Sequence, residues 1–188
     1  HSGVSSSVTR AGTVNTEQAS RLTSSKYLLS PFPLHIDDSS AQTMLQIMAT
    51  ARSLKMRHGI RLIVVDYLQL IHPESRQANR EEQVAGISRR LKQMARELAV
   101  PVVAMAQLNR QAEERAPRLS DLRESGAIEQ DADVVMFIYR EDKVKENSDR
   151  KNQADILIAK HRNGPTGEVR LYFNQEKASF SSLDQRES

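Results

Sequence analysis

Leu62-Ile63-Val64-Val65-Asp66 is a run of four consecutive apolar residues followed directly by a carboxylate. Such a run is typical of a buried strand in a parallel sheet, and α/β proteins bind ligands at the carboxyl ends of these strands. A carboxylate at this place can hold a magnesium–nucleotide complex. Because Asp also caps turns after apolar runs, the stretch alone leaves both interpretations of Asp66 open.

Composition limits the class of protein. The 188 residues suffice for one sizeable core, and the absence of Cys excludes disulfides and thiolate zinc sites. No apolar run reaches membrane-spanning length, and the first nine residues are polar and rich in Ser, so we expect a cytoplasmic protein with no membrane partner. The net charge of +3 argues only weakly for a polyanionic partner.

Helical and strand-like segments alternate along the chain. We expect a flexible segment at 1–12, one domain at 13–182 and a tail at 183–188. Apolar residues at helical spacing predict helices at 44–54 and 84–98, and a further helix at 16–29 is expected to end before the prolines that follow it. Asp37 to Ser40 are expected to cap the start of the helix at 44–54, and Gly59 is expected to mark its C-terminus. Strands are predicted at 34–36, 62–65, 101–106, 133–139 and 154–159, with a hairpin of 168–173 and 177–180. This order predicts an α/β sheet that is parallel in its middle and antiparallel at one edge.

Three polar residues stand at the ends of predicted strands: Asp66, Gln107 and Lys160. Each alone is an ordinary strand-end residue. The ends of neighbouring parallel strands converge on one crevice, however, so the three together favour a site. An acid for magnesium, an amide to orient a phosphate or water, and a cation to neutralise charge are the components of phosphoryl transfer.

The chain resembles the DnaB-type replicative DNA helicases through five ordered blocks. These are Asp66 to Ile71, Ile87 to Lys92, Ala106 to Arg110, Ser120 to Asp133 and Lys160 to Gly167. The resemblance implies a RecA-like P-loop NTPase core, with a mostly parallel sheet flanked by helices and an antiparallel C-terminal edge. It further implies use of ATP and Mg²⁺, a homohexameric ring around single-stranded DNA that unwinds duplex DNA, and partnership with primase and a helicase loader. A bacterial or phage protein located near the nucleoid is expected.

The resemblance also assigns roles to single residues. Asp66 matches the acid that holds magnesium, through water, and Gln107 matches the glutamine that couples the γ-phosphate to the DNA-facing loop. Lys160 and Arg162 match the basic finger that enters the nucleotide site of the next subunit. Because Lys160 and Arg162 are two residues apart on a predicted strand, we expect their side chains on the same face. The planar guanidinium of Arg162 can donate two hydrogen bonds to phosphate oxygens.

Arg123, Glu124 and Gly126 match the DNA-contacting loop of the family. Residues 110–124 contain four arginines and four acids and no aromatic residue. Contact with DNA through the backbone and one or two placed cations is therefore expected, without base stacking. Arg123 paired with Asp121 or Glu129 is the structural alternative.

Two departures qualify the resemblance. No Gly-x-x-x-x-Gly-Lys-Ser/Thr occurs in the chain, and the catalytic glutamate that follows this loop in the family is expected upstream of His1. Smaller departures are His161, where the family commonly has Gln, and a somewhat short segment between Arg110 and Ser120. We therefore expect a fragment of a helicase that lacks the phosphate loop and the catalytic glutamate, and that hydrolyses no ATP alone. The alternatives are a non-catalytic ring or loader-binding module, or another ATPase of the RecA superfamily.

Overall fold

The computed structural model describes residues 1–73, 79–109 and 115–183, with the backbone alone at 123–125. The chain forms two compact units. The first contains residues 1–34, 137–157 and 167–188, and the second contains 35–136 and 158–166. No helix in the described ranges is long and apolar enough to cross a membrane.

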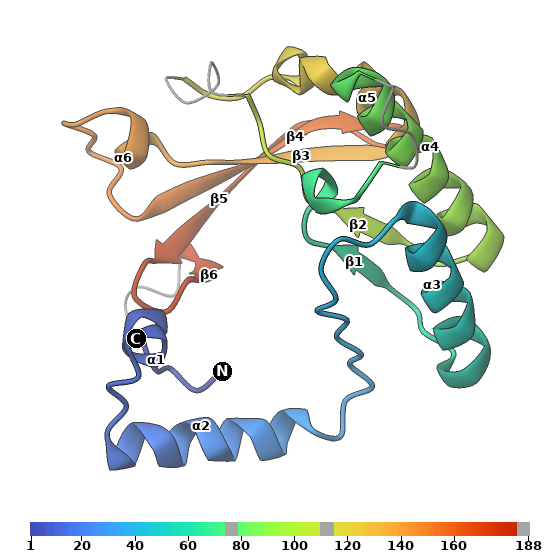
Figure 1. Cartoon of the computed structure of the whole chain (residues 1–188). Coiled ribbons are helices and arrows are strands. Elements are labelled where there is room, and N and C mark those ends of the chain that lie inside the picture. Colours follow the sequence, from blue (N-terminus) through green and yellow to red (C-terminus); the bar gives the residue numbers. More distant parts are fainter. Residues whose placement is uncertain (74–78, 110–114, 184–188) are drawn as a thin grey trace. The chain divides into compact units, whose positions relative to one another are not determined.

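In the second unit, two helices pack beside a parallel strand pair (Figure 1). The strands β1 (Ile63–Val65) and β2 (Val102–Ala104) pair in parallel, with Val64 opposite Val103. The helices α3 (Met44–His58) and α4 (Arg80–Leu98) bury the core residues against them, and the short 3₁₀ helix η1 (Leu68–Leu70) follows β1. The core residues include Met44, Met48, Leu68, Ile87, Leu91 and Met94. The α/β class and the parallel pair that follows the apolar run of β1 are confirmed.

Local sequence explains both helices of this core. Thr43 and Gln46 form a capping box at the start of α3, and Gly59 ends that helix in the left-handed region at φ 61°. Asn79 and Glu82 form the corresponding box of α4, whose apolar residues recur on one face. The predicted helices at 44–54 and 84–98 are therefore confirmed.

The prediction of a strand at 34–36 and a helix cap at 37–40 is wrong. In the structure these residues lie outside helices and strands, and the cap of α3 is Thr43 instead. Leu34 and Ile36 are exposed, so neither burial nor strand pairing stabilises an extended strand there.

The apolar run of β1 predicts a strand buried on both faces, but one face of the β1–β2 pair is exposed. Ile63 and Val65 pack on the core, whereas Val64 is 53% and Val103 44% exposed. Successive strand residues point to opposite faces, and α3 and α4 cover only one of these faces in the described ranges. The apolar run therefore has a covered side and an open side.

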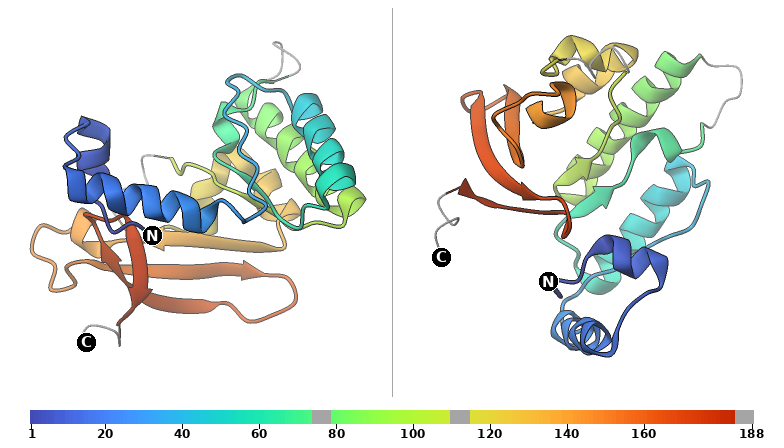
Figure 2. Two further views of the ribbon diagram at one scale, coloured as in Figure 1. Left: turned by 90° about the horizontal axis from the view of Figure 1, so that it is seen from below. Right: turned by 90° about the vertical axis from the view of Figure 1, so that its left-hand side faces the viewer.

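The remaining strands form a sheet in the order β3-β4-β5-β6. They are β3 (Val134–Tyr139), β4 (Gln153–His161), β5 (Gly167–Asn174) and β6 (Ser179–Ser182), and the predicted antiparallel edge is confirmed by the pairing of β5 with β6 (Figure 2). In this hairpin Phe173 lies opposite Phe180, with ring centroids 4.9 Å apart, and Arg140 lies over the Phe173 ring.

Three more helices belong to the first unit: α1 (Ser6–Ala11), α2 (Thr16–Leu29) and α6 (Glu141–Val144). The predicted helix at 16–29 is confirmed to the residue. The segment 1–12, expected to be flexible, contains α1, which is capped by the Ser5 side chain and ends at Gly12 with φ 68°. These local caps satisfy backbone groups that would otherwise favour an irregular segment.

A buried carboxylate organises the segment before the last helix of the second unit. This segment contains the 3₁₀ helix η3 (Leu119–Ser125) and leads directly into α5 (Gly126–Asp131). Asp121 accepts two hydrogen bonds from the Arg115 guanidinium, at 2.8 and 2.7 Å, and one from the Arg118 backbone N–H at 2.7 Å. These bonds, above all those from Arg115, lower the pKa of Asp121 below its ordinary value.

Truncation of Met94 tests the core. Met94 is 1% exposed, so we expect Met94→Ala to lower the free energy of unfolding by about 2–5 kcal/mol, through lost burial and the remaining cavity. Val64→Ala is the matched control and should change it by less than about 0.5 kcal/mol, because that side chain is exposed already. Urea unfolding measures both, and equal losses would contradict the described core.

Neutralisation of Asp121 tests the pH dependence of folding stability. Because the pKa of Asp121 is lower in the folded state, its contribution to stability is present above the ordinary value of 3.8 and disappears as the pH falls through the folded-state pKa. Asp121→Asn should therefore unfold at a lower temperature than wild type near pH 7, and this gap should close under acid conditions. Exposed Asp149 provides the control Asp149→Asn. A gap independent of pH would show that the Asp121 charge is not involved.

Candidate functional site

The loops that follow β1 and β2 are joined at one edge of the sheet. Asp66 follows β1 directly and is exposed. Leu68 N–H donates to the Met105 carbonyl at 2.9 Å, and Met105 N–H donates to the Val65 carbonyl at 2.9 Å. The prediction that polar strand-end residues converge therefore holds for the segments that carry Asp66 and Gln107.

Gln69 links the two loops, a role that the sequence did not reveal. Its side-chain amide donates to the Gln107 carbonyl at 3.1 Å and accepts from the Gln107 N–H at 3.3 Å. Both bonds fix the Gln107 backbone and leave its side chain exposed. A signal was present, since Gln69 lies in the same block as Asp66, but only the fold shows its partner.

Asp66 fits a magnesium ion held partly by water. Mg²⁺ prefers oxygen ligands, keeps several waters and commonly uses one or two carboxylates together with substrate phosphates. The Asp66 carboxylate is exposed at a strand end and has no hydrogen bond or ion pair within the described ranges. The same ranges contain no group of three His, Cys, Asp or Glu side chains that could hold a metal without such help.

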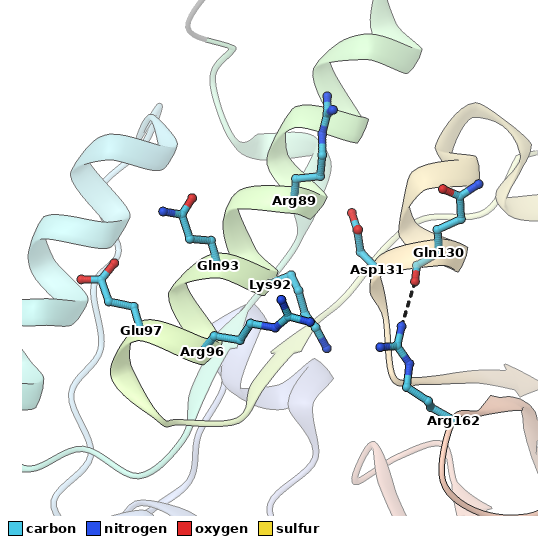
Figure 3. Close-up of a pocket in the computed structure, with 8 residues that line it drawn as sticks. All are labelled: Arg89, Lys92, Gln93, Arg96, Glu97, Gln130, Asp131 and Arg162. Atoms are coloured by element: carbon cyan, nitrogen blue, oxygen red, sulfur yellow. Dashed lines mark hydrogen bonds between the residues drawn. The ribbon is translucent and has the colours of Figure 1, made fainter.

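A second feature of this unit is a basic cleft of about 590 Å³ beside α4 (Figure 3). It is lined by Arg89, Lys92, Gln93, Arg96, Glu97, Gln130, Asp131 and Arg162. The three cations on α4 lie three and four residues apart and so share one face of the helix. Glu97 is already bound by Arg52 from α3, at 2.5 and 2.8 Å. The cleft thus combines a cationic helix face with Arg162.

The end of α5 holds both candidate finger residues. Lys160 Nζ donates to the Glu129 carbonyl, and Arg162 Nη2 donates to the Gln130 carbonyl at 3.1 Å (Figure 3). The last carbonyls of a helix carry partial negative charge and lack partners within the helix, so they attract cations. The two side chains lie together on one face, as their spacing predicts.

Asp133 also binds Arg162. Arg162 Nε lies 3.3 Å from Asp133 Oδ1, and the Arg162 N–H donates to the Asp133 carbonyl at 2.8 Å. Lys92 forms a hydrogen-bonded ion pair with Oδ2 of the same carboxylate. The bond from Lys92, followed by the charges of Lys92, Arg162 and Arg96, lowers the pKa of Asp133.

Arg162 and Asp66 lie beside different parts of α4: Arg80 at its start binds the Gln69 carbonyl in the loop that follows Asp66. The cleft that Arg162 lines includes Arg96 in the last turn of α4, which leads into the start of β2. Asp66 and Gln107, by contrast, follow the ends of β1 and β2. Lys160 binds the Glu129 carbonyl at the end of α5, whereas Gln107 is bonded to Gln69 in the loop after β1. The single crevice expected for Asp66, Gln107 and Lys160 stays a prediction.

The remaining family positions are described only in part. The side chains of Arg123 and Glu124 lie outside the described residues. Gly126 begins α5 in helical conformation, and a Cβ built on it would meet nothing within 4 Å. His161 turns toward the 163–166 turn, where its Nδ1 lies 3.2 Å from the Pro165 carbonyl. His161 therefore does not share the face of Lys160 and Arg162.

Comparison with known proteins assigns the family. The family of DnaB-like helicase C-terminal domains matches residues 1–182. The chain is 48% identical over 178 residues to replicative DNA helicase DnaB of Buchnera aphidicola (subsp. Acyrthosiphon pisum), covering 92% of this chain and 39% of that protein. It is 46% identical over 181 residues to the DnaB of Geobacillus stearothermophilus, covering 94% and 40%.

A solved structure agrees with these sequence matches. It is a DnaB-like replicative helicase, described together with its interactions with primase. The TM-score is 0.89 at 39% identity, over 97% of this chain and 46% of that one. The chain thus spans less than half the length of these relatives. It belongs to the family of DnaB-like helicase C-terminal domains.

Proposed function

We propose that this chain works in the motor domain of an ATP-driven replicative helicase, a homohexameric ring that moves along single-stranded DNA and unwinds the duplex. One observation carries the proposal beyond family membership. Arg162 lines the cleft along the second half of α4, whereas Arg80 at the start of that helix binds the Gln69 carbonyl in the loop that follows Asp66. We therefore expect that one chain does not bring both residues to one nucleotide. Two neighbouring copies can do so, with Arg162 of one chain facing the Asp66 edge of the next.

In the proposed chemistry, one chain supplies Asp66 and Gln107, and the neighbouring chain supplies Lys160 and Arg162. Asp66 would hold Mg²⁺, which would neutralise phosphate charge when it is bound. Gln107, whose backbone is fixed by Gln69, orients its amide toward the γ-phosphate. From the neighbouring chain, the Arg162 fork and the Lys160 charge stabilise the negative charge of the transition state. Since the chain contains no Gly-x-x-x-x-Gly-Lys-Ser/Thr, the activity is proposed for a helicase that combines these residues with a phosphate loop.

The proposed DNA contact lies at the start of α5. Arg123, Glu124 and the Gly126 backbone would track phosphates, repeated around a ring so that weak contacts add up. The open space around Gly126 supports close approach of a strand. Both oxygens of Asp121 already bind Arg115, which speaks against Asp121 as the structural partner of Arg123.

Partners and location follow from the relatives. The DnaB-like helicase to which the chain is similar interacts with primase, and we extend a primase contact to the helicase that contains this chain. A helicase loader is proposed in the same way. We place the protein in the bacterial or phage-infected cytoplasm, at the nucleoid, where its DNA substrate lies.

Substitution of Arg162 tests action between subunits. In a helicase that contains this chain and a phosphate loop, Arg162→Ala should reduce ATP turnover by about 10³-fold or more, because the transition-state charge loses its fork. Nucleotide binding to the same subunit should stay within about twofold of wild type, since the side chain serves the adjacent site. Steady-state turnover and fluorescent-nucleotide titration measure the two effects.

The control for this experiment is Arg57→Ala, which removes an exposed arginine of α3 and should leave turnover unchanged. In rings mixed with Asp66→Asn subunits, turnover should depend on which variants are neighbours. Activity that simply follows the fraction of wild-type subunits would argue that Arg162 acts within its own chain.

Substitution of Arg123 separates DNA binding from chemistry. Arg123→Ala should weaken binding of single-stranded DNA equally for different base sequences, and it should reduce the slope of log K against log salt by about 0.7 for each phosphate that is no longer neutralised. Fluorescence anisotropy over a salt series measures this slope, with Arg61→Ala as the exposed control. An unchanged slope, or a loss of thermal stability large enough to explain weaker binding, would assign Arg123 a structural role.

A further inference from the structure

We infer that Asp133 is a positioning residue for Arg162, and that Lys92 in turn holds Asp133. Asp133 would keep the guanidinium of Arg162 aimed for use by the neighbouring subunit without touching the nucleotide itself. The inference rests on the proposed function, because it explains how the finger of that function is held in place.

Arg162 is held at three points. Its backbone N–H donates to the Asp133 carbonyl at 2.8 Å, its Nε pairs with Asp133 Oδ1 at 3.3 Å, and its Nη2 donates to the Gln130 carbonyl at 3.1 Å. The first bond places the start of the side chain and the other two orient the guanidinium plane. A planar group restrained at two of its nitrogen atoms loses most of its rotational freedom.

The anchoring of Asp133 distinguishes this arrangement from an ordinary surface ion pair. Oδ2 of Asp133 binds Lys92, which lies on α4 next to the core residue Leu91. Lys92 is only 20% exposed, whereas Asp133 is 55% exposed. The carboxylate is therefore tied on one side to a helix packed in the core, and it presents its other oxygen to Arg162. A functional side chain needs this kind of rigid support to stay in productive geometry.

Arg162 keeps donors for a further ligand. A guanidinium has five N–H groups. In the described ranges Arg162 donates one side-chain hydrogen bond, from Nη2, and forms an ion pair through Nε, while Nη1 has no partner. The side chain is 43% exposed and lines the basic cleft. This arrangement restrains the group and leaves one end available to phosphate oxygens.

The first test uses the 188-residue chain as it is. The Nε–Hε signal of Arg162, assigned by NMR through its loss in Arg162→Lys, reports hydrogen exchange and ordering of the side chain. We expect Asp133→Asn to accelerate Hε exchange by about two- to fivefold and to lower the heteronuclear NOE, because the ion pair that restrains Nε loses its negative charge. The matched control is Glu97→Gln, which should loosen Arg52 and leave Arg162 unchanged. An unchanged Arg162 signal in folded Asp133→Asn overturns the inference.

The second test uses the ring-forming helicase with its phosphate loop. Asp133→Asn and Lys92→Gln should lower kcat by about ten- to a hundredfold through misplacement of Arg162, while the Kd for nucleotide and the Tm stay near wild type. Asp133→Glu should recover part of the loss, and it also keeps the test decisive if Asp133→Asn does not fold. In mixed rings the defect should appear at the site of the neighbour that receives Arg162.

The outcomes separate the inference from the function on which it rests. If Arg162→Ala leaves turnover intact, the proposed finger role fails, whatever Asp133 does. If Arg162→Ala abolishes turnover but Asp133→Asn keeps full kcat, the positioning role is overturned and the finger stands. A fall in kcat that is matched by an equal loss of nucleotide binding or of Tm also overturns it, because that pattern reports damage to the fold.

Discussion

The packing of α4 against the sheet is the constraint on which the second unit depends. Its apolar face buries Leu91 and Met94 in the core, and this burial fixes the orientation of the whole helix. Because the buried face sets the rotation of the helix about its axis, the direction of its other face is set as well. Lys92 and Arg96 on that face line the basic cleft (Figure 3). One helix thus stabilises the fold and supplies the cations that border Arg162.

Parallel pairing of β1 with β2 has a consequence for assembly. Parallel strands end at one edge, so the loops carrying Asp66 and Gln107 meet there and are bound together by Gln69. Arg162 follows β4, a strand of the other sheet, and lines the cleft beside the second half of α4. The proposed nucleotide site would therefore draw its residues from two copies of the chain.

The short helix α5 connects two of the proposed functions. It begins at Gly126, immediately after the residues proposed to contact DNA, and its last carbonyls bind Lys160 and Arg162. Six helical residues span about 9 Å at 1.5 Å per residue, too short a distance to bend easily. A displacement at one end of such a rigid element would be transmitted to the other, which offers a physical route from DNA contact to the finger.

The class of the fold, the helices at 16–29 and 84–98 and the antiparallel C-terminal edge could be predicted from the sequence. Periodicity, caps and strand-end residues act over a few neighbouring positions, so they can be read without a partner. Three features could be seen only in the tertiary structure: Gln69 binds Gln107, Val64 of β1 is exposed, and Arg162 lines a cleft that does not include Asp66. Lys92 and Asp133 are 41 residues apart, and only the packing of α4 brings their charges together. Pairing over such a separation depends on the whole fold, which no local pattern encodes.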